Sequence, residues 1–158
     1  MNIYTFKLTK KHIVGANLVA AALVALLILA IPGGEETVQT GAAVTVKTQE
    51  DCVRYLTELG YQLDAASGES KKVQIPKTFD AVYEAYNQMQ RDCGFDLAKY
   101  AGKKVELTTF KVTNWPEEET VLVDVLVYKN KVIGGAVYTA AVDGFMYGLQ
   151  PMSALTGN

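Results

Sequence analysis

The sequence predicts an α+β domain that follows an N-terminal transmembrane helix. Three observations lead to this fold class. An uncharged apolar run occupies Ile13–Ile31. Two later segments repeat apolar residues with helical spacing, and three closely spaced segments after Lys104 are dense in β-branched residues. The expected architecture is two helices packed on one face of an antiparallel sheet of four to six strands.

The apolar run Ile13–Ile31 is interpreted as an uncleaved membrane anchor. Its 19 residues, at about 1.5 Å each, span roughly the 30 Å hydrocarbon core of a bilayer. Lys7, Lys10 and Lys11 precede it, so residues 1–12 are expected to be a cytoplasmic basic tail and everything after the run to lie outside. A cleaved signal peptide is the main alternative, although the run is long and ends without a clear A-x-A site. A buried helix of a soluble protein is a third interpretation, which the absence of a polar face disfavours.

The rest of the chain divides into a linker and one domain. Residues 32–47 are small, polar and glycine-containing, as is typical of a spacer. Residues 48–158 are long enough for one extracytoplasmic domain with a core. All 17 acidic residues and 12 of the 15 basic residues follow the apolar run, which gives that part a formal charge of −5. We expect such a domain to bind no nucleic acid and to have little attraction for anionic lipid.

The first half of the domain predicts one helix followed by short strands. Thr48 is expected to cap the helix, with Asp51 completing an imperfect capping box, and Gly60 to end it. The stretch that follows predicts two short strands around a turn. These segments are Tyr61–Leu63, the turn Ser67–Ser70, and Val73–Ile75.

The second half predicts another helix and an antiparallel meander. Apolar residues recur at helical spacing from Phe79 to Cys93, with Thr78 as the expected cap and Gly94 after the last turn. Short connections between the later strands favour antiparallel pairing, with Lys129-Asn130 as one of the turns. The expected strands are Lys104–Asn114, Thr120–Tyr128 and Lys131–Thr139, and Val142–Leu149 forms a last strand or a packed loop.

Few catalytic groups are present in the domain. The only histidine, His12, precedes the apolar run, which removes imidazole-based nucleophilic catalysis and histidine metal sites. No glycine-rich phosphate loop opens a helix. We therefore expect a non-enzymatic domain with no cofactor and no metal. The acidic residues that a hydrolase could use, expected instead to be solvated, are Asp80, Glu84, Asp92 and Asp96. Glu117–Glu119 are expected to form a solvated loop with too few ligands for calcium.

Asp124 interrupts an apolar strand segment. It shares one side of that strand with Leu122 and Leu126. If that side is the core, the carboxylate is costly to bury without a partner and becomes a functional candidate. We favour the other interpretation, in which Asp124 lies on the open face of the sheet.

Cys52 and Cys93 are a possible disulfide. Cys52 is near the start of the first helix and Cys93 near the end of the second, and antiparallel helices would bring these ends together. An extracytoplasmic location would allow the bond to persist. Both residues also fall on apolar stripes, so buried thiols are the alternative.

One sheet edge is the expected interaction surface. Gly134-Gly135 within a strand marks a bulge or a close approach of another chain. An exposed edge can accept a strand from a partner. The residues expected at this edge are Gly134, Gly135, Asp143, Phe145 and Tyr147, and Trp115 is a second candidate for the contact surface.

Several phrases together resemble an uncharacterised bacterial family, domain of unknown function family 4830. They are Val73–Pro76, Tyr86–Gln90, Gly94–Leu97, Tyr100–Lys103, Val132–Gly135 and Asp143–Met146. The resemblance covers roughly residues 48–150. It implies a Gram-positive source and a single N-terminal membrane segment, and it brings no established activity. The family pattern often has Asp and His where this chain has Ala136 and Tyr147, which weakens any polar site at that edge.

These expectations together predict a single-pass membrane protein with an extracytoplasmic binding domain. Its partner is expected to be a protein or another component of the cell envelope. Two alternatives remain open. One is a carboxylate-based hydrolase acting on the envelope. The other is a structural subunit of a membrane complex, in which Ile13–Ile31 itself makes the contacts.

Overall fold

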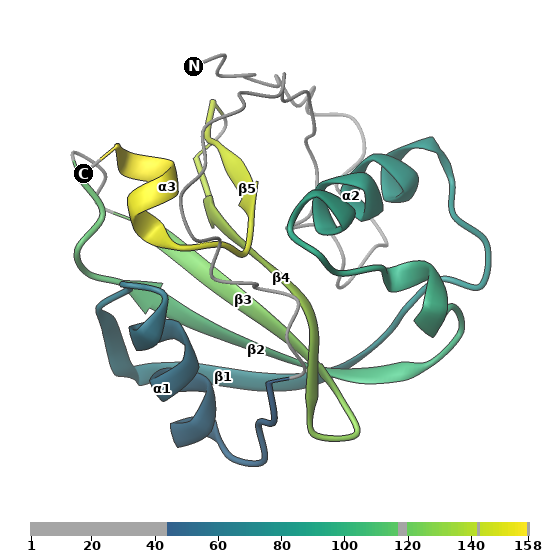
Figure 1. Ribbon diagram of the computed structural model, residues 1–158, viewed down its shortest axis with the longest axis horizontal. Helices are drawn as coiled ribbons and strands as arrows, with labels where there is room; N and C mark the ends of the chain where they lie inside the picture. The colour runs from purple at the N-terminus through teal and green to yellow at the C-terminus, as the bar shows by residue number, and fades with distance from the viewer. Residues whose placement is uncertain (1–43, 117–119, 142, 158) are drawn as a thin grey trace.

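The computed structural model describes residues 44–116, 120–141 and 143–157. They form an α+β fold in which three α-helices pack on a five-stranded antiparallel sheet (Figure 1). The elements in chain order are α1 (Gln49–Glu58), β1 (Leu63–Gln74), α2 (Ala81–Asp92), the 3₁₀ turn η1 (Leu97–Tyr100), β2 (Lys104–Val112), β3 (Val121–Tyr128), β4 (Lys131–Thr139), β5 (Met146–Gly148) and α3 (Met152–Thr156).

The sheet is a simple meander in which every strand pairs with its neighbour in the chain, in the order β1-β2-β3-β4-β5. The predicted antiparallel pairing and the strand number are therefore confirmed. Lys129 and Asn130 form the two-residue turn between β3 and β4, and both have positive φ, at 48° and 64°. Positive φ at both central positions is the geometry that matches the twist of a tight hairpin.

One strand, β1, replaces the two short strands and the turn that the sequence predicts around Ser67–Ser70. The register with β2 jumps between Asp64 and Glu69, so the residues expected to turn form a bulge inside a continuous strand. The Ser67 hydroxyl stabilises this bulge, because it donates to the Asp64 carbonyl and accepts from the Lys111 N–H. The serine and glycine residues correctly predicted an irregular backbone at this position, but the prediction that the strand ends there is wrong.

The helix ends follow local chemistry. The Thr48–Asp51 capping box of α1 is confirmed, with reciprocal side-chain to backbone hydrogen bonds. Helix α2 is capped by Asp80 and not by Thr78, since the Asp80 carboxylate accepts from the N–H of Tyr83 at 2.7 Å. A carboxylate at this position also interacts favourably with the helix dipole. Gly94 follows α2 with φ of 84°, as predicted.

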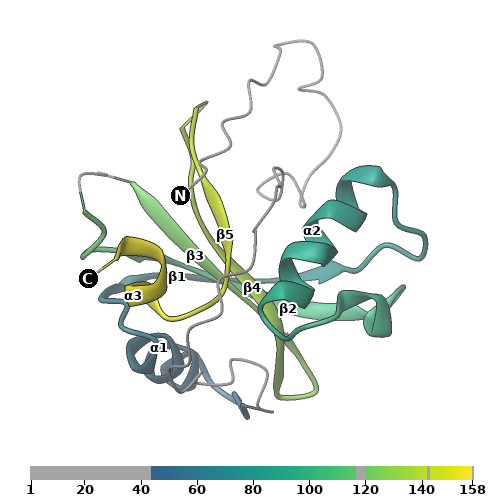
Figure 2. The same cartoon turned by 45° about the horizontal axis from the view of Figure 1, so that its top comes forward.

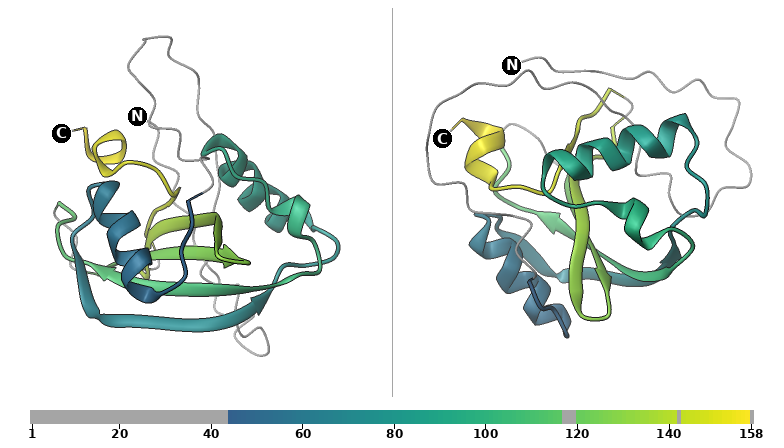
Figure 3. Two further views of the ribbon diagram at one scale, coloured as in Figure 1. Left: turned by 60° about the horizontal axis from the view of Figure 1, so that its bottom comes forward. Right: turned by 45° about the vertical axis from the view of Figure 1, so that its right-hand side comes forward.

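The core is divided into two clusters on opposite sides of β3. Side chains alternate along a strand. Val121, Val123 and Val125 pack with α1, whereas Leu122 and Leu126 pack in the cluster that contains side chains of α2. Figures 2 and 3 show α1 and α2 on either side of the β4–β5 pair. The prediction that the helices share one face is therefore wrong at β3, because its continuous apolar sequence supplies two buried sides.

Within the described residues, no helix is long and apolar enough to cross a membrane. The predicted anchor, Ile13–Ile31, lies outside them, as do Glu117–Glu119.

Candidate functional site: an aromatic cluster and a buried carboxyl group

Three aromatic side chains, from two separate connections and from strand β5, stack together. The Phe145 ring stacks with both of the others, with its centroid 4.8 Å from that of Trp115 and 5.0 Å from that of Tyr147. The Trp115 and Tyr147 centroids are 6.4 Å apart, and all three planes lie within 29° of one another. Each of the three side chains is partly exposed. We call Trp115, Phe145 and Tyr147 the aromatic cluster.

Sheet geometry and one asparagine position the cluster. Phe145 and Tyr147 are two residues apart, so their side chains leave the same side of β5. Trp115 follows Asn114 in the β2–β3 connection. The Asn114 side chain accepts from the N–H of Gln62 at 2.9 Å and donates to the carbonyl oxygen of Gly60 at 3.0 Å. These two bonds hold the start of the connection against the end of α1.

Gly134 and Gly135 do not belong to an exposed edge. Both are buried. A Cβ on Gly134 would lie 2.6 Å from Oε1 of Gln90, and one on Gly135 would meet the backbone oxygen of Asp124. The glycines permit close packing of α2 and Leu149 against β4. The predicted bulge is also present beside them, because the register of β4 with β3 shifts between the Leu126–Gly134 and Val127–Val132 pairs. A bulky substitution there would test folding and not partner binding.

Asp143 is exposed and lies in the β4–β5 connection that also carries Phe145. The structure thus brings together the second half of the predicted surface, Phe145 and Tyr147, with the distant Trp115. It separates them from the glycine pair, which is covered. The position of Trp115 could not be derived from the sequence spacing, because it depends on which connections meet at one end of the sheet.

Asp124 is buried, with 7% of its surface exposed, so the favoured prediction of an open face is wrong. The Thr109 hydroxyl donates to its Oδ1 at 2.6 Å, and the Tyr138 hydroxyl donates to the same oxygen at 3.3 Å. Burial raises the pKa of the carboxyl to about 6, although both hydroxyl groups and the nearby Lys71 act in the opposite direction. The side of β3 that carries Asp124 is therefore also buried, because the Tyr86 ring and its neighbours cover it.

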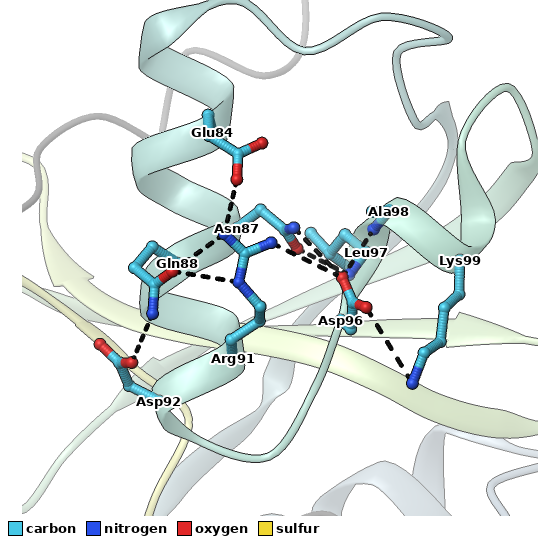
Figure 4. Close-up of polar contacts among 9 residues, drawn as sticks. All are labelled: Glu84, Asn87, Gln88, Arg91, Asp92, Asp96, Leu97, Ala98 and Lys99. Carbon is cyan, nitrogen blue, oxygen red and sulfur yellow. Dashed lines mark hydrogen bonds and ion pairs between the residues drawn. The ribbon is translucent and has the colours of Figure 1, made fainter.

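The acidic residues of α2 have structural partners (Figure 4). Arg91 forms an ion pair with Glu84 at 2.5 Å. The Gln88 amide donates to Asp92 at 2.8 Å. Asp96 caps η1, accepting from the N–H of Ala98 at 3.2 Å. Asp80, Glu84 and Asp92 are exposed, as expected, whereas Asp96 is partly exposed and precedes η1.

Cys52 and Cys93 are free thiols in this structure, so of the two alternatives it contains the buried thiols and not the disulfide. Cys52 is buried and Cys93 is partly buried, and both pack in the cluster that includes α1. Burial raises the pKa of each thiol to about 11. Both cysteines are therefore thiols packed in or against the core.

Sequence reasoning missed two polar side chains that are completely buried, Asn87 and Gln90. The Asn87 carbonyl oxygen accepts from the N–H of Leu97 at 2.7 Å. Both residues lie on the apolar face of α2, and a polar residue at such a position is the signal that could have identified them. Across the described part of the chain, no group of three or more histidine, cysteine or acidic side chains could hold a metal ion.

Comparison with curated proteins and with solved structures finds no match. Comparison with family models does, and it agrees with the resemblance in the sequence phrases. The family described as Domain of unknown function (DUF4830) matches residues 55–137, more than half of the chain, so the protein belongs to that family.

Proposed function

We propose that the chain is a single-pass membrane-anchored domain, displayed outside the cytoplasm, that binds a partner through the aromatic cluster. The observation that carries this proposal is the stack of three partly exposed rings from two connections and strand β5. Aromatic side chains are enriched at the centres of binding surfaces, because they bury a large area with few rotatable bonds. A partner protein of the envelope fits this apolar surface.

The location rests on the sequence. The apolar run Ile13–Ile31 has the length of a bilayer span, and its flanking charges favour a cytoplasmic N-terminus. Treating intact cells with an external protease tests this topology. The domain should be digested from outside, leaving a short anchored fragment. Full protection in intact cells, with digestion only after lysis, would contradict the proposed display.

The hydrolase alternative has one supporting observation, the buried Asp124 with its raised pKa. Glycoside hydrolysis requires two carboxyl groups about 5–10 Å apart. Asp124 is the one acidic residue among the buried residues of the described chain, and its hydrogen-bond partners are hydroxyl groups. These contacts favour a binding domain over an acid-pair enzyme.

A photo-crosslinking amino acid tests the contact surface in the full-length protein within its own membrane. Ala141 is exposed and lies in the same connection as Phe145, whereas Ala65 is exposed in the bulge of β1 and serves as the control position. We expect a defined adduct from position 141 and not from position 65. Trp115→Ala should abolish that adduct, and Trp115→Phe should retain part of it.

Two results would contradict the proposal. One is the same set of adducts from both positions. The other is an adduct at position 141 that persists when Trp115→Ala is folded, as judged by its thermal unfolding. Either result would move the contact surface away from the aromatic cluster.

A further inference from the structure

A second surface feature lies at the opposite side of the sheet from the buried carboxyl group. A pocket of about 570 Å³ opens between the start of α1, strands β1 and β2, and the β3–β4 turn. Pockets that bind small molecules typically have volumes of about 300–1,000 Å³. Its lining includes the buried Cys52 and Thr108, so it extends down to the core.

Four lysines from four different segments line this pocket. They are Lys47 before α1, Lys72 on β1, Lys104 on β2 and Lys129 in the β3–β4 turn. Glu106 is the one acidic residue of the lining, which leaves three more positive than negative charges. In the described part of the chain, none of the four lysines lies within ion-pair distance of a carboxylate. We call this feature the lysine pocket.

The segregation of charge is unexpected for an acidic chain. The formal net charge of the protein is −2, and the part after the apolar run is more acidic. Four cationic side chains around one cavity therefore form a local positive potential against the charge of the domain. Cavities lined by one sign of charge concentrate counter-ions of the opposite sign.

The lysine pocket lies at the end of the fold where the described chain begins. Val44 accepts a backbone hydrogen bond from Val132 at 3.1 Å, and Val46 donates one to Asn130 at 2.8 Å. Helix α1 and the β3–β4 turn lie side by side at this end (Figures 1 and 3). Residues 1–43, which contain the proposed anchor, join the domain here. If the anchor spans the bilayer, the linker connects this end of the domain to it.

From the pocket, its lysines and the place where the chain enters, we infer that this domain binds a phosphate-bearing anion in the lysine pocket. The shared chemistry is a phosphate ester, carried by an anionic lipid headgroup or by a soluble molecule. Lysine ammonium groups bind phosphate as point charges, and several around one cavity can contact it together. The lipid source rests on the proposed anchor, whereas phosphate binding does not.

Lys129 provides a variant that separates binding from folding. Its φ of 48° lies in the left-handed region. A lysine there is more strained than glycine, which adopts this region freely. Lys129→Gly should therefore fold at least as stably as the natural chain while losing one pocket charge. We expect about a fivefold weaker affinity for the anion, the typical effect of one lysine near an anionic surface.

The test is lysine reactivity of the full-length protein in nanodiscs, with acetylation rates of individual lysines read by mass spectrometry. Lys111 is exposed on the same strand as Lys104 and lies outside the pocket, so it is the internal reference. One arm compares phosphatidylcholine discs with discs that contain phosphatidylglycerol. The other adds glycerol phosphate to phosphatidylcholine discs and compares it with sodium chloride of equal ionic strength.

Protection of Lys72 and Lys104 by phosphatidylglycerol alone supports a lipid headgroup as the ligand. Protection by glycerol phosphate supports a soluble phosphate ester. In both cases Lys129→Gly should weaken the protection, and Lys77→Gln, at an exposed lysine outside the pocket, should not. Equal rates in every condition, or protection unchanged in Lys129→Gly and in Lys72→Gln, would overturn the inference. Trp115→Ala should leave the protection intact, so loss of the aromatic surface and loss of this site are distinguishable.

Discussion

The Gln90 carboxamide forms two hydrogen bonds with the backbone of Gly135. Its Nε2 donates to the Gly135 carbonyl oxygen at 2.9 Å, and its Oε1 accepts from the Gly135 N–H at 2.9 Å. A helix side chain thus pairs with a strand as a neighbouring peptide group would. This pairing satisfies the backbone of β4 just before its ladder with β5 begins at Ala136.

Replacing Gln90 with alanine should destabilise the protein strongly. The change leaves the buried N–H of Gly135 without a partner and opens a cavity beneath α2. Each buried polar group left unpaired costs about 1–3 kcal/mol. We expect the free energy of unfolding to fall by about 2–4 kcal/mol in urea titrations. Gln88→Ala, on the exposed side of the same helix, is the matched control and should cost less than about 1 kcal/mol. Equal losses in the two variants would contradict the role assigned to Gln90.

The two glycines of β4 should differ in their tolerance of a methyl group. A Cβ on Gly135 would meet the backbone oxygen of Asp124 and lie 2.8 Å from Leu149. A Cβ on Gly134 would meet mainly the end of the Gln90 side chain, at 2.6 Å. Backbone cannot move aside as a side chain can, so Gly135→Ala should lower the thermal unfolding midpoint more than Gly134→Ala. Overpacking of this kind costs about 1–3 kcal/mol, occasionally more. The reverse order would show that the Gln90 contact is the more rigid of the two.

Asp124 should make stability depend on pH in an unusual direction. Burial raises the pKa of its carboxyl from 3.8 to about 6. The folded protein therefore keeps this proton over a pH range in which the unfolded chain has already lost it. The contribution of Asp124 to the free energy of unfolding falls as the pH rises from about 4 to about 6, and it is constant above that range. A shift of this size corresponds to about 3 kcal/mol.

Asp124→Asn checks this dependence, because the amide keeps an acceptor for the Thr109 and Tyr138 hydroxyl groups but does not titrate. The difference between the unfolding free energies of Asp124→Asn and the natural chain should grow in favour of the variant between about pH 4 and pH 6. Urea titrations at several pH values measure it. Parallel curves would show that Asp124 titrates normally in the folded protein.

The two cysteines should react slowly in the folded state and fully after unfolding. Burial raises the pKa of both thiols to about 11, and only the thiolate is alkylated readily. At about pH 8 we expect little reaction of the native protein with iodoacetamide. In urea without reductant, intact mass should show two added groups. A chain that gains them only after reduction contains the Cys52–Cys93 disulfide.

Local signals in the sequence were sufficient for most element boundaries. Some signals affect only the backbone within a few residues of their own position, so their effects could be predicted directly. Examples are the Thr48–Asp51 capping box, Gly94 after α2 and the Lys129-Asn130 turn. The Ser67-Gly68 segment shows the limit of such signals. An irregular backbone conformation can end a strand or form a bulge within it. Here it forms a bulge, because β1 pairs with β2 both before and after the irregular segment.

The candidate site was predicted only in part. Phe145 and Tyr147 were assigned to one surface from their proximity in the chain, and they do lie together. Their contact with Trp115 joins segments about thirty residues apart. The periodicity of apolar residues within one segment cannot predict a contact between two distant segments. The lysine pocket was missed for the same reason, since its four lysines come from segments scattered between Lys47 and Lys129.

The sequence by itself determined the α+β class, the meander and the cap of α1, because these depend on patterns within single segments. Tertiary structure alone decided which sides of each strand are buried. The strand pattern around Asp124 allows an exposed or a buried carboxylate, and the exposed one was favoured. Packing of α2 side chains on that side of the sheet buries it instead. The glycine pair was likewise predicted to lie at an open sheet edge, whereas the Gln90 side chain covers it. Burial is a property of contacts between distant segments, so it is fixed only when the chain has folded.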